Sequence, residues 1–106
     1  MIIIEIPYAP VNLMIFAGDQ ERAAFDLKVK HQFPEWEGSE DADGMHFHNH
    51  IFVESLDEKG ILLHELFHFL EWLFGYMEIG EESEFKACIS SVLLNQIFFK
   101  EGIYEL

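Results

Sequence analysis

The feature that most constrains this chain is a long apolar run from Ile61 to Phe74. All but four of its positions are apolar, and the exceptions are His64, Glu65, His68 and Glu71. A helix that is apolar on all sides is normally a buried helix. Ser55 with Glu58 three residues later predicts a capping box before it, and Gly75 is a natural stop after it. We therefore expect a buried helix between Ser55 and Gly75.

The polar interruptions of this helix have the spacing of metal ligands. His64 and His68 lie one above the other on a helix face, so both rings can reach one ion, at about 2.0–2.1 Å if it is zinc. Glu65 lies about 100° further around the helix, where it can hold and deprotonate a metal-bound water. This His-Glu-x-x-His pattern is typical of zinc metallopeptidases. The alternative is a core helix whose two histidines make ordinary hydrogen bonds.

A catalytic zinc takes three protein ligands and leaves a fourth position for water. The metzincin pattern is excluded, because it needs a histidine where this chain has Phe74. A second long helix is predicted from about Glu81 to Phe99, and its small residues Ala87, Cys88 and Ser91 would let it approach the first helix closely. Glu84, on that small face, is the first candidate for the third ligand. The other candidates are Glu81, Glu82 and Glu71, the last of which we interpret as a supporting carboxylate or a cleft wall.

The rest of the chain predicts a small sheet and an acidic loop. Residues 2–6 and 11–16 are expected strands, whereas 19–30 suits a short helix from Asp19 and a strand over 25–30 equally well. Residues 34–44 are rich in acidic residues, Ser and Gly, which predicts an exposed loop. Met45 to Glu54 reads as one strand, on which His46, His48 and His50 would share a face. We expect these three to face the cleft or solvent without holding a second metal ion.

Composition restricts the partners and the compartment. The 106 residues are expected to form a single domain, 1–106, and the net charge of −14 argues against nucleic acid and anionic membranes as partners. Cys88 is the single cysteine, so a reducing cytosol is plausible. We found no signal peptide or membrane span in the sequence, and we expect a soluble cytoplasmic protein.

The run from Gly44 to Leu94 resembles the small zincin-like metallopeptidases found among phage and prophage proteins, within the broader gluzincin group. The shared layout is a strand, a short acidic turn, Leu62 to His68, a loop, and Glu84-Phe85-Lys86-Ala87 opening a helix. The resemblance covers about half of the chain, and its only sharply specific part is the five-residue motif. It implies a zinc ion held by His64, His68 and Glu84, with Glu65 as the catalytic base.

The resemblance also implies a minimal α+β fold, with a small twisted sheet packed on two long helices. The expected function is a zinc-dependent metallopeptidase that holds a peptide or protein substrate along an edge strand between Met45 and Val53. The chain departs from well-studied peptidases in having no Tyr, His or Arg clearly placed to stabilise an oxyanion, a role in which Tyr76 or one of His46, His48 and His50 could serve. The alternative is a non-enzymatic module that keeps the metal for stability while its acidic surface binds a basic protein.

Overall fold

The computed structural model describes residues 1–6, 9–79 and 84–99. This part of the chain forms a mixed sheet of the strands β1 (Ile2–Ile4), β2 (Leu13–Ala17), β3 (Gly44–Phe47) and β4 (His50–Val53). Its helices are α1 (Asp19–Gln32), α2 (Lys59–Tyr76) and α3 (Glu84–Leu94), and α3 continues into the π-helical turn η1 (Asn95–Phe99). The predicted α+β class is confirmed.

The strand order is β1-β2-β4-β3, which places β3 at an edge of the sheet. β1 is antiparallel to β2, β2 is parallel to β4, and β3 is antiparallel to β4. Side chains on the central strands alternate between the two faces, as the period of a strand requires. Ile15 and Ile51 therefore lie in one buried cluster, and their neighbours Phe16 and Phe52 lie in the other.

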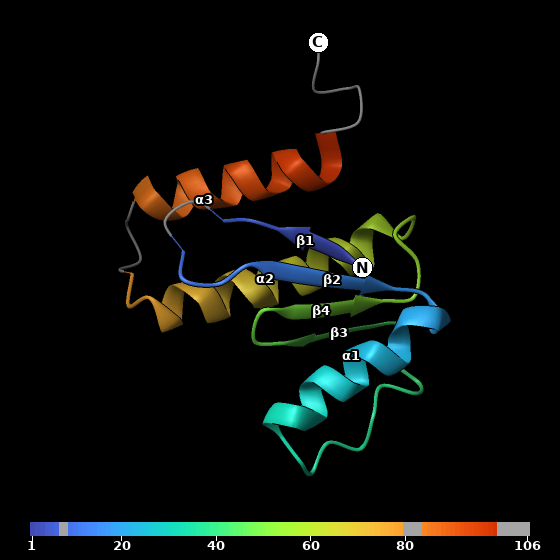
Figure 1. The fold of residues 1–106 in the computed structure, drawn as a ribbon. Coiled ribbons are helices and arrows are strands. Elements are labelled where there is room, and N and C mark those ends of the chain that lie inside the picture. The colour runs from blue at the N-terminus through green and yellow to red at the C-terminus, as the bar shows by residue number, and fades with distance from the viewer. Residues whose placement is uncertain (7–8, 80–83, 100–106) are drawn as a thin grey trace.

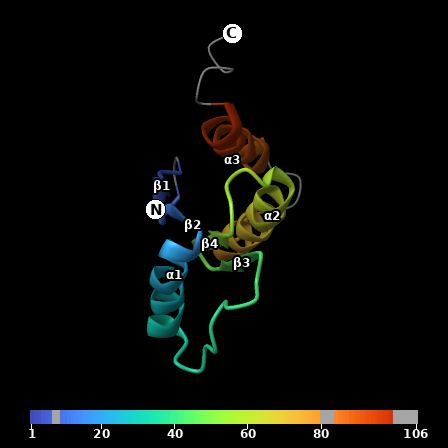
Figure 2. The same ribbon diagram turned by 90° about the vertical axis from the view of Figure 1, so that its right-hand side faces the viewer.

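Each face of the sheet is covered by a helix. Figure 2 shows α1 on one side of the sheet and α2 on the other. Phe25 and Val29 of α1 pack with Phe16 and Phe52, while Leu62, Leu66, Phe69 and Leu73 of α2 pack on the opposite face together with Ile89 and Leu93 of α3. The sequence left residues 19–30 open between helix and strand. The structure has a helix there, because Phe25 and Val29, four residues apart, face the sheet while Leu27 is 72% exposed.

The prediction that the motif helix is buried on all sides was wrong. His64, His68 and Glu71 are exposed, and the side chain of Phe67 is 57% exposed. The ends of α2 also differ from the predicted ends of this helix. Ser55 caps only the turn before the helix, since its Oγ accepts from the backbone N–H of Asp57 at 3.1 Å, and the N-cap of α2 is Glu58. At the other end α2 continues through Gly75 to Tyr76.

The prediction of a single strand from Met45 to Glu54 was also wrong, because the segment is a β-hairpin. The chain reverses at His48 and Asn49, and His48 adopts a left-handed backbone conformation with φ of 52°. Asn49 fixes this turn to the residue before β2, since its side-chain N–H donates to the carbonyl of Asn12 at 2.8 Å. The three histidines therefore do not all lie on one face of the sheet. His50 is buried against Phe16, whereas His46 and His48 contact rings of α2.

The two helices α2 and α3 run in opposite directions, as Figure 1 shows. Their register is given by two lysines that lie over aromatic rings. Lys86 Nζ is 5.3 Å from the centre of the Phe74 ring, and Lys59 Nζ is 5.8 Å from that of Phe98. The start of α3 therefore lies beside the end of α2. Within the described ranges, none of the helices has the length and apolar character that crossing a membrane would need.

Candidate metal centre

His64 and His68 present their ring nitrogens to each other on the open side of α2. The two Nε2 atoms are 3.1 Å apart and the rings are nearly perpendicular, at 82°. Two nitrogens bound at about 2.0–2.1 Å to one tetrahedral zinc ion lie about 3.3 Å apart. In the absence of metal, one ring N–H can donate to the other ring's lone pair at this distance. The side-chain positions therefore fit a shared metal ion without rearrangement of the helix.

Glu65 points in a different direction, toward the edge of the sheet. Its side chain is buried, with 7% exposed, and its carboxyl lies against Gly44 at the start of β3. Burial raises the pKa of Glu65, and the nearby His64 and His68 oppose that rise. A carboxyl group held out of water beside a histidine pair has the position and the raised proton affinity of a general base.

His46 of β3 joins the histidine pair from the side of the sheet. Its ring is stacked on the ring of His68, with centroids 6.1 Å apart and planes 17° from parallel. Its Nε2 donates to the backbone carbonyl of His48 at 2.7 Å. Burial lowers the pKa of His46, and the contact with the His48 carbonyl acts in the opposite direction.

Sequence reasoning missed the closeness of His46 to the pair, because it read residues 45–54 as one strand. The only signal for a turn was Asn49, a residue that tolerates turns well, within an alternating pattern of histidines.

A row of stacked rings continues from this site along α2. His48 lies between Phe47 and Trp72, with ring centroids 4.2 Å and 5.3 Å away, and Trp72 stacks in turn on Tyr76 at 5.1 Å. Tyr76 is 59% exposed. The tyrosine expected near the site thus belongs to an aromatic surface that extends away from the histidine pair toward the end of α2.

The structure does not bring Glu84 to the histidine pair. Glu84 is the exposed first residue of α3, and the adjacent Lys86 lies over Phe74. Phe74 is six residues beyond His68, which is about 9 Å along the helix axis. Among the described residues, no group of three or more His, Cys, Asp or Glu side chains is close enough together to hold a metal ion. Glu81 and Glu82 lie outside the described residues.

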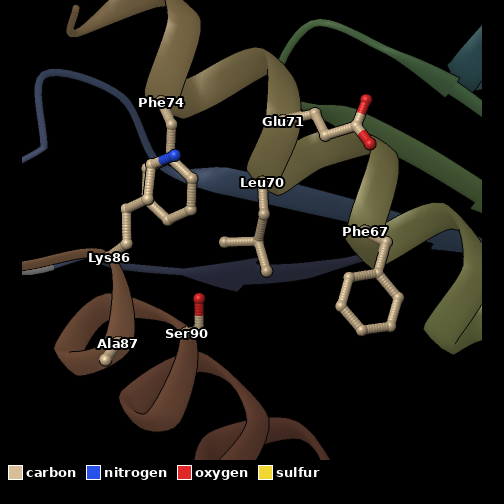
Figure 3. Close-up of a pocket in the computed structure, with 7 residues that line it drawn as sticks. All are labelled: Phe67, Leu70, Glu71, Phe74, Lys86, Ala87 and Ser90. Carbon is tan, nitrogen blue, oxygen red and sulfur yellow. The ribbon is translucent and has the colours of Figure 1, made fainter. Parts of the chain in front are cut away.

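An open pocket of about 320 Å³ lies between α2 and α3 (Figure 3). Its lining residues are Phe67, Leu70, Glu71, Phe74, Lys86, Ala87 and Ser90. Glu71 is thus a wall of a cleft, one of the two positions expected for it. The close-up shows the Glu71 carboxylate and the Phe67 ring projecting from α2, and Lys86 reaching from α3 toward Phe74.

Comparisons with protein-family models, with curated proteins and with solved structures found no match to this chain.

Proposed function

We propose that this protein is a zinc-dependent amide hydrolase that cleaves peptides. The observation that carries the proposal is the pair of facing Nε2 atoms of His64 and His68, 3.1 Å apart, with the buried carboxyl of Glu65 one residue away. The two exposed histidines are suitable ligands for a metal ion, and the buried carboxyl of Glu65 is suitable as a general base. These are the groups that metal-assisted hydrolysis needs.

Zinc bound at such a site supplies a Lewis acid that brings the pKa of a water molecule down to about 7. Glu65 would accept the proton of that water, because its carboxyl is buried beside the histidine pair. The oxygen of that water would bond to the carbonyl carbon of the substrate, and the same carboxyl would donate the proton to the amide nitrogen as the C–N bond breaks and the amine leaves. The exposure of His64 and His68 leaves room for a substrate carbonyl to reach them.

The edge strand β3 supports a peptide as the substrate. Within the described ranges β3 pairs with β4 alone, so the backbone groups along its other edge can pair with an extended chain. His46 lies on this strand and stacks on His68, so a peptide added to β3 runs past the histidine pair. The net charge of −14 favours basic peptides over acidic ones.

The test measures bound zinc and peptide cleavage in the same preparations. We expect one zinc per chain in the wild type, and none in His64→Ala or His68→Ala. Glu65→Gln should keep its zinc and lose hydrolysis of a mixed peptide library by about 10²–10⁴-fold, because an amide cannot take the proton from water. Equal zinc in wild type and His64→Ala contradicts the metal site. A zinc-loaded wild type that cleaves nothing contradicts the hydrolase and favours a metal-stabilised binding module.

A further inference from the structure

We infer that the pocket between α2 and α3 binds the side chain of an arginine or lysine of the substrate, with Glu71 pairing its charge and Phe67 packing against its stem. This inference rests on the proposed function, because it takes the bound side chain to belong to the peptide that is cleaved. It narrows the substrate from peptides in general to peptides with a basic residue close to the scissile bond.

Two residues that line the pocket are neighbours of the histidine pair on α2. Phe67 lies three residues after His64, and Glu71 lies three residues after His68. Residues three apart on a helix are adjacent on its surface, with about 5–6 Å between their Cβ atoms. All four side chains are exposed. A peptide whose carbonyl group reaches the histidine pair therefore has a neighbouring side chain within reach of the pocket.

The histidine pair lies between the pocket and the edge strand β3. Glu65, His68 and Glu71 are three residues apart, so each lies about 60° further around the helix than the one before. The first of them packs against Gly44 of β3, and the last lines the pocket on the side of α3. A peptide that is paired with the free edge of β3 can therefore extend a side chain across the histidine pair toward α3.

The charge of Glu71 is available to a ligand. Its carboxylate makes no ion pair or hydrogen bond with the described part of the chain, and it does not join the histidine pair in a group of three possible metal ligands there. Lys86 lines the same pocket, but its Nζ lies 5.3 Å from the centre of the Phe74 ring. Figure 3 shows Lys86 directed toward Phe74, away from Glu71. The unpaired carboxylate favours a cationic partner.

The rest of the lining suits the stem of a basic side chain. Phe67, Leu70 and Phe74 of α2 and Ala87 of α3 give the pocket apolar walls. Arginine and lysine bury their methylene groups along apolar surface while the charged end stays near water. The Phe67 ring, with 57% of the side chain exposed, can also lie under a guanidinium group. An occupant with an apolar stem and a cationic end therefore matches both parts of the lining.

Other occupants match only one part of the lining. A purely apolar side chain would cover the carboxylate of Glu71 without giving it a partner, which costs free energy. An acidic side chain could pair with Lys86, but it would share the pocket with Glu71 and approach a protein with a net charge of −14. Charge complementarity therefore selects a basic side chain.

The binding test needs neither catalysis nor metal. The probes are the N-acetyl methylamides of arginine, lysine, citrulline, leucine and glutamate, titrated into metal-free and zinc-loaded protein and followed by NMR. Citrulline has nearly the shape of arginine without its charge. We expect the arginine probe to bind about 5–10-fold more tightly than the citrulline probe, as a partly exposed ion pair with a cation–π contact would give. Equal affinities for these two probes, or tightest binding of the leucine or glutamate probe, overturn the inference.

Three variants locate the binding site. Glu71→Gln should remove the preference for arginine over citrulline, and Phe67→Ala should weaken the binding of both probes. Glu35→Gln is the matched control, because it removes the same charge from an exposed position in the acidic loop. It should keep the wild-type preference. A preference that survives in Glu71→Gln, or that falls equally in Glu35→Gln, comes from the overall charge and overturns the inference. Thermal unfolding checks that each variant is folded.

Peptide cleavage separates this inference from the proposed function. The wild type should cleave a mixed library close to arginine and lysine. Glu71→Gln should raise KM for those peptides about fivefold while its zinc content stays the same, because it loses an ion pair and no metal ligand. Cleavage without a preference for basic residues overturns the inference and leaves the hydrolase standing. Glu71-dependent binding of the arginine probe by a zinc-loaded protein that cleaves nothing contradicts the hydrolase and supports the basic side-chain pocket.

Discussion

Gly44 of β3 leaves the space that the carboxyl of Glu65 occupies. A Cβ atom at position 44 would lie 3.0 Å from Oε2 of Glu65 and 2.6 Å from Cγ2 of Ile61. Both distances are too short for ordinary contact, so the strand can approach the helix this closely only with glycine at that position. The location of the base therefore depends on a residue at the edge of the sheet.

Gly44→Ala should displace Glu65 and Ile61 and lower the free energy of unfolding by about 1–3 kcal/mol, as overpacking does in a close-packed region. The measurement is urea unfolding, with zinc content and peptide cleavage in the same samples. Zinc should be retained, and cleavage should fall, because the base moves while His64 and His68 do not. Gly60→Ala is the control. A Cβ atom there has nothing within 4 Å, so that substitution should stabilise the helix by about 0.5–1 kcal/mol. Equal effects of the two alanines would contradict this account of Gly44.

Glu65→Gln should stabilise the metal-free protein at neutral pH. Burial raises the pKa of Glu65, so the folded state holds this proton to higher pH than the unfolded state does. The contribution of the neutral acid to stability is complete below the unfolded pKa of about 4.3, and it is lost as pH rises through the folded pKa. The gap in unfolding temperature between the variant and the wild type, with chelator present, should therefore be larger at pH 7 than at pH 4. An equal difference in unfolding temperature at pH 4 and at pH 7 would contradict this prediction.

The parts of the fold that the sequence predicted were those with a strong local pattern. The strands near the N-terminus, the acidic loop and the motif helix all exist, with ends shifted by a few residues, and the described residues 84–99 of the last predicted helix are helical. Periodicity and turn composition act over neighbouring residues, so they are visible in the sequence alone. The histidine pair was predictable for the same reason, since residues four apart on a helix are always neighbours.

The predictions that were wrong concern features that depend on contacts between residues far apart in the sequence. Whether Leu63 and Phe67 are covered is decided by where α3 packs, and no local pattern shows this. The hairpin at His48 and Asn49 carries no glycine, so Asn49 was the only residue in it that indicated a turn, and nothing indicated the left-handed backbone of His48. Because the hairpin was missed, His46 was placed on a row with His50 instead of beside His68.

Arg22 of α1 is one of the residues that attach the acidic loop, residues 33–43, to the rest of the fold, together with Trp36, whose Nε1–H donates to Asp26 at 3.1 Å. The guanidinium donates to the backbone carbonyl of Ser39 and, at 3.2 Å, to that of Ala42, and it lies 4.3 Å from the centre of the Phe52 ring. Arg22→Met keeps the apolar stem and removes the donors. It should cost about 1.5–3 kcal/mol of unfolding free energy and make the loop a site of rapid proteolysis.

Ser39→Ala is the matched control for Arg22→Met, because it keeps the carbonyl that Arg22 uses. Its buried Oγ has no hydrogen-bond partner within the described part of the chain, so its removal should leave stability unchanged or slightly higher. If the loop is cleaved equally fast in both variants, the attachment does not depend on Arg22. Limited proteolysis followed by mass spectrometry measures both rates in one experiment.

His50 should make the stability of the protein depend on pH below neutrality. It is buried on the α1 side of the sheet, and burial lowers its pKa, with Lys28 acting in the same direction and the Phe47 carbonyl against it. An unfolded histidine titrates near pH 6.5, so below that value the unfolded state binds a proton that the folded state resists. Stability should thus fall as pH drops from about 6.5 through the folded pKa, and it is fully retained above 6.5.

His50→Gln replaces the imidazole with a neutral side chain that can still donate to the Phe47 carbonyl, which His50 Nδ1 contacts at 3.3 Å. The variant should lose less stability than the wild type between pH 7.5 and pH 5.5, whatever its stability at pH 7.5. Part of the wild-type slope should remain, because burial also lowers the pKa of His46. Urea unfolding across this range, with chelator present, measures both slopes. If the two slopes are equal, the buried imidazole of His50 contributes nothing to the acid sensitivity, and His46 or the carboxylates must account for all of it.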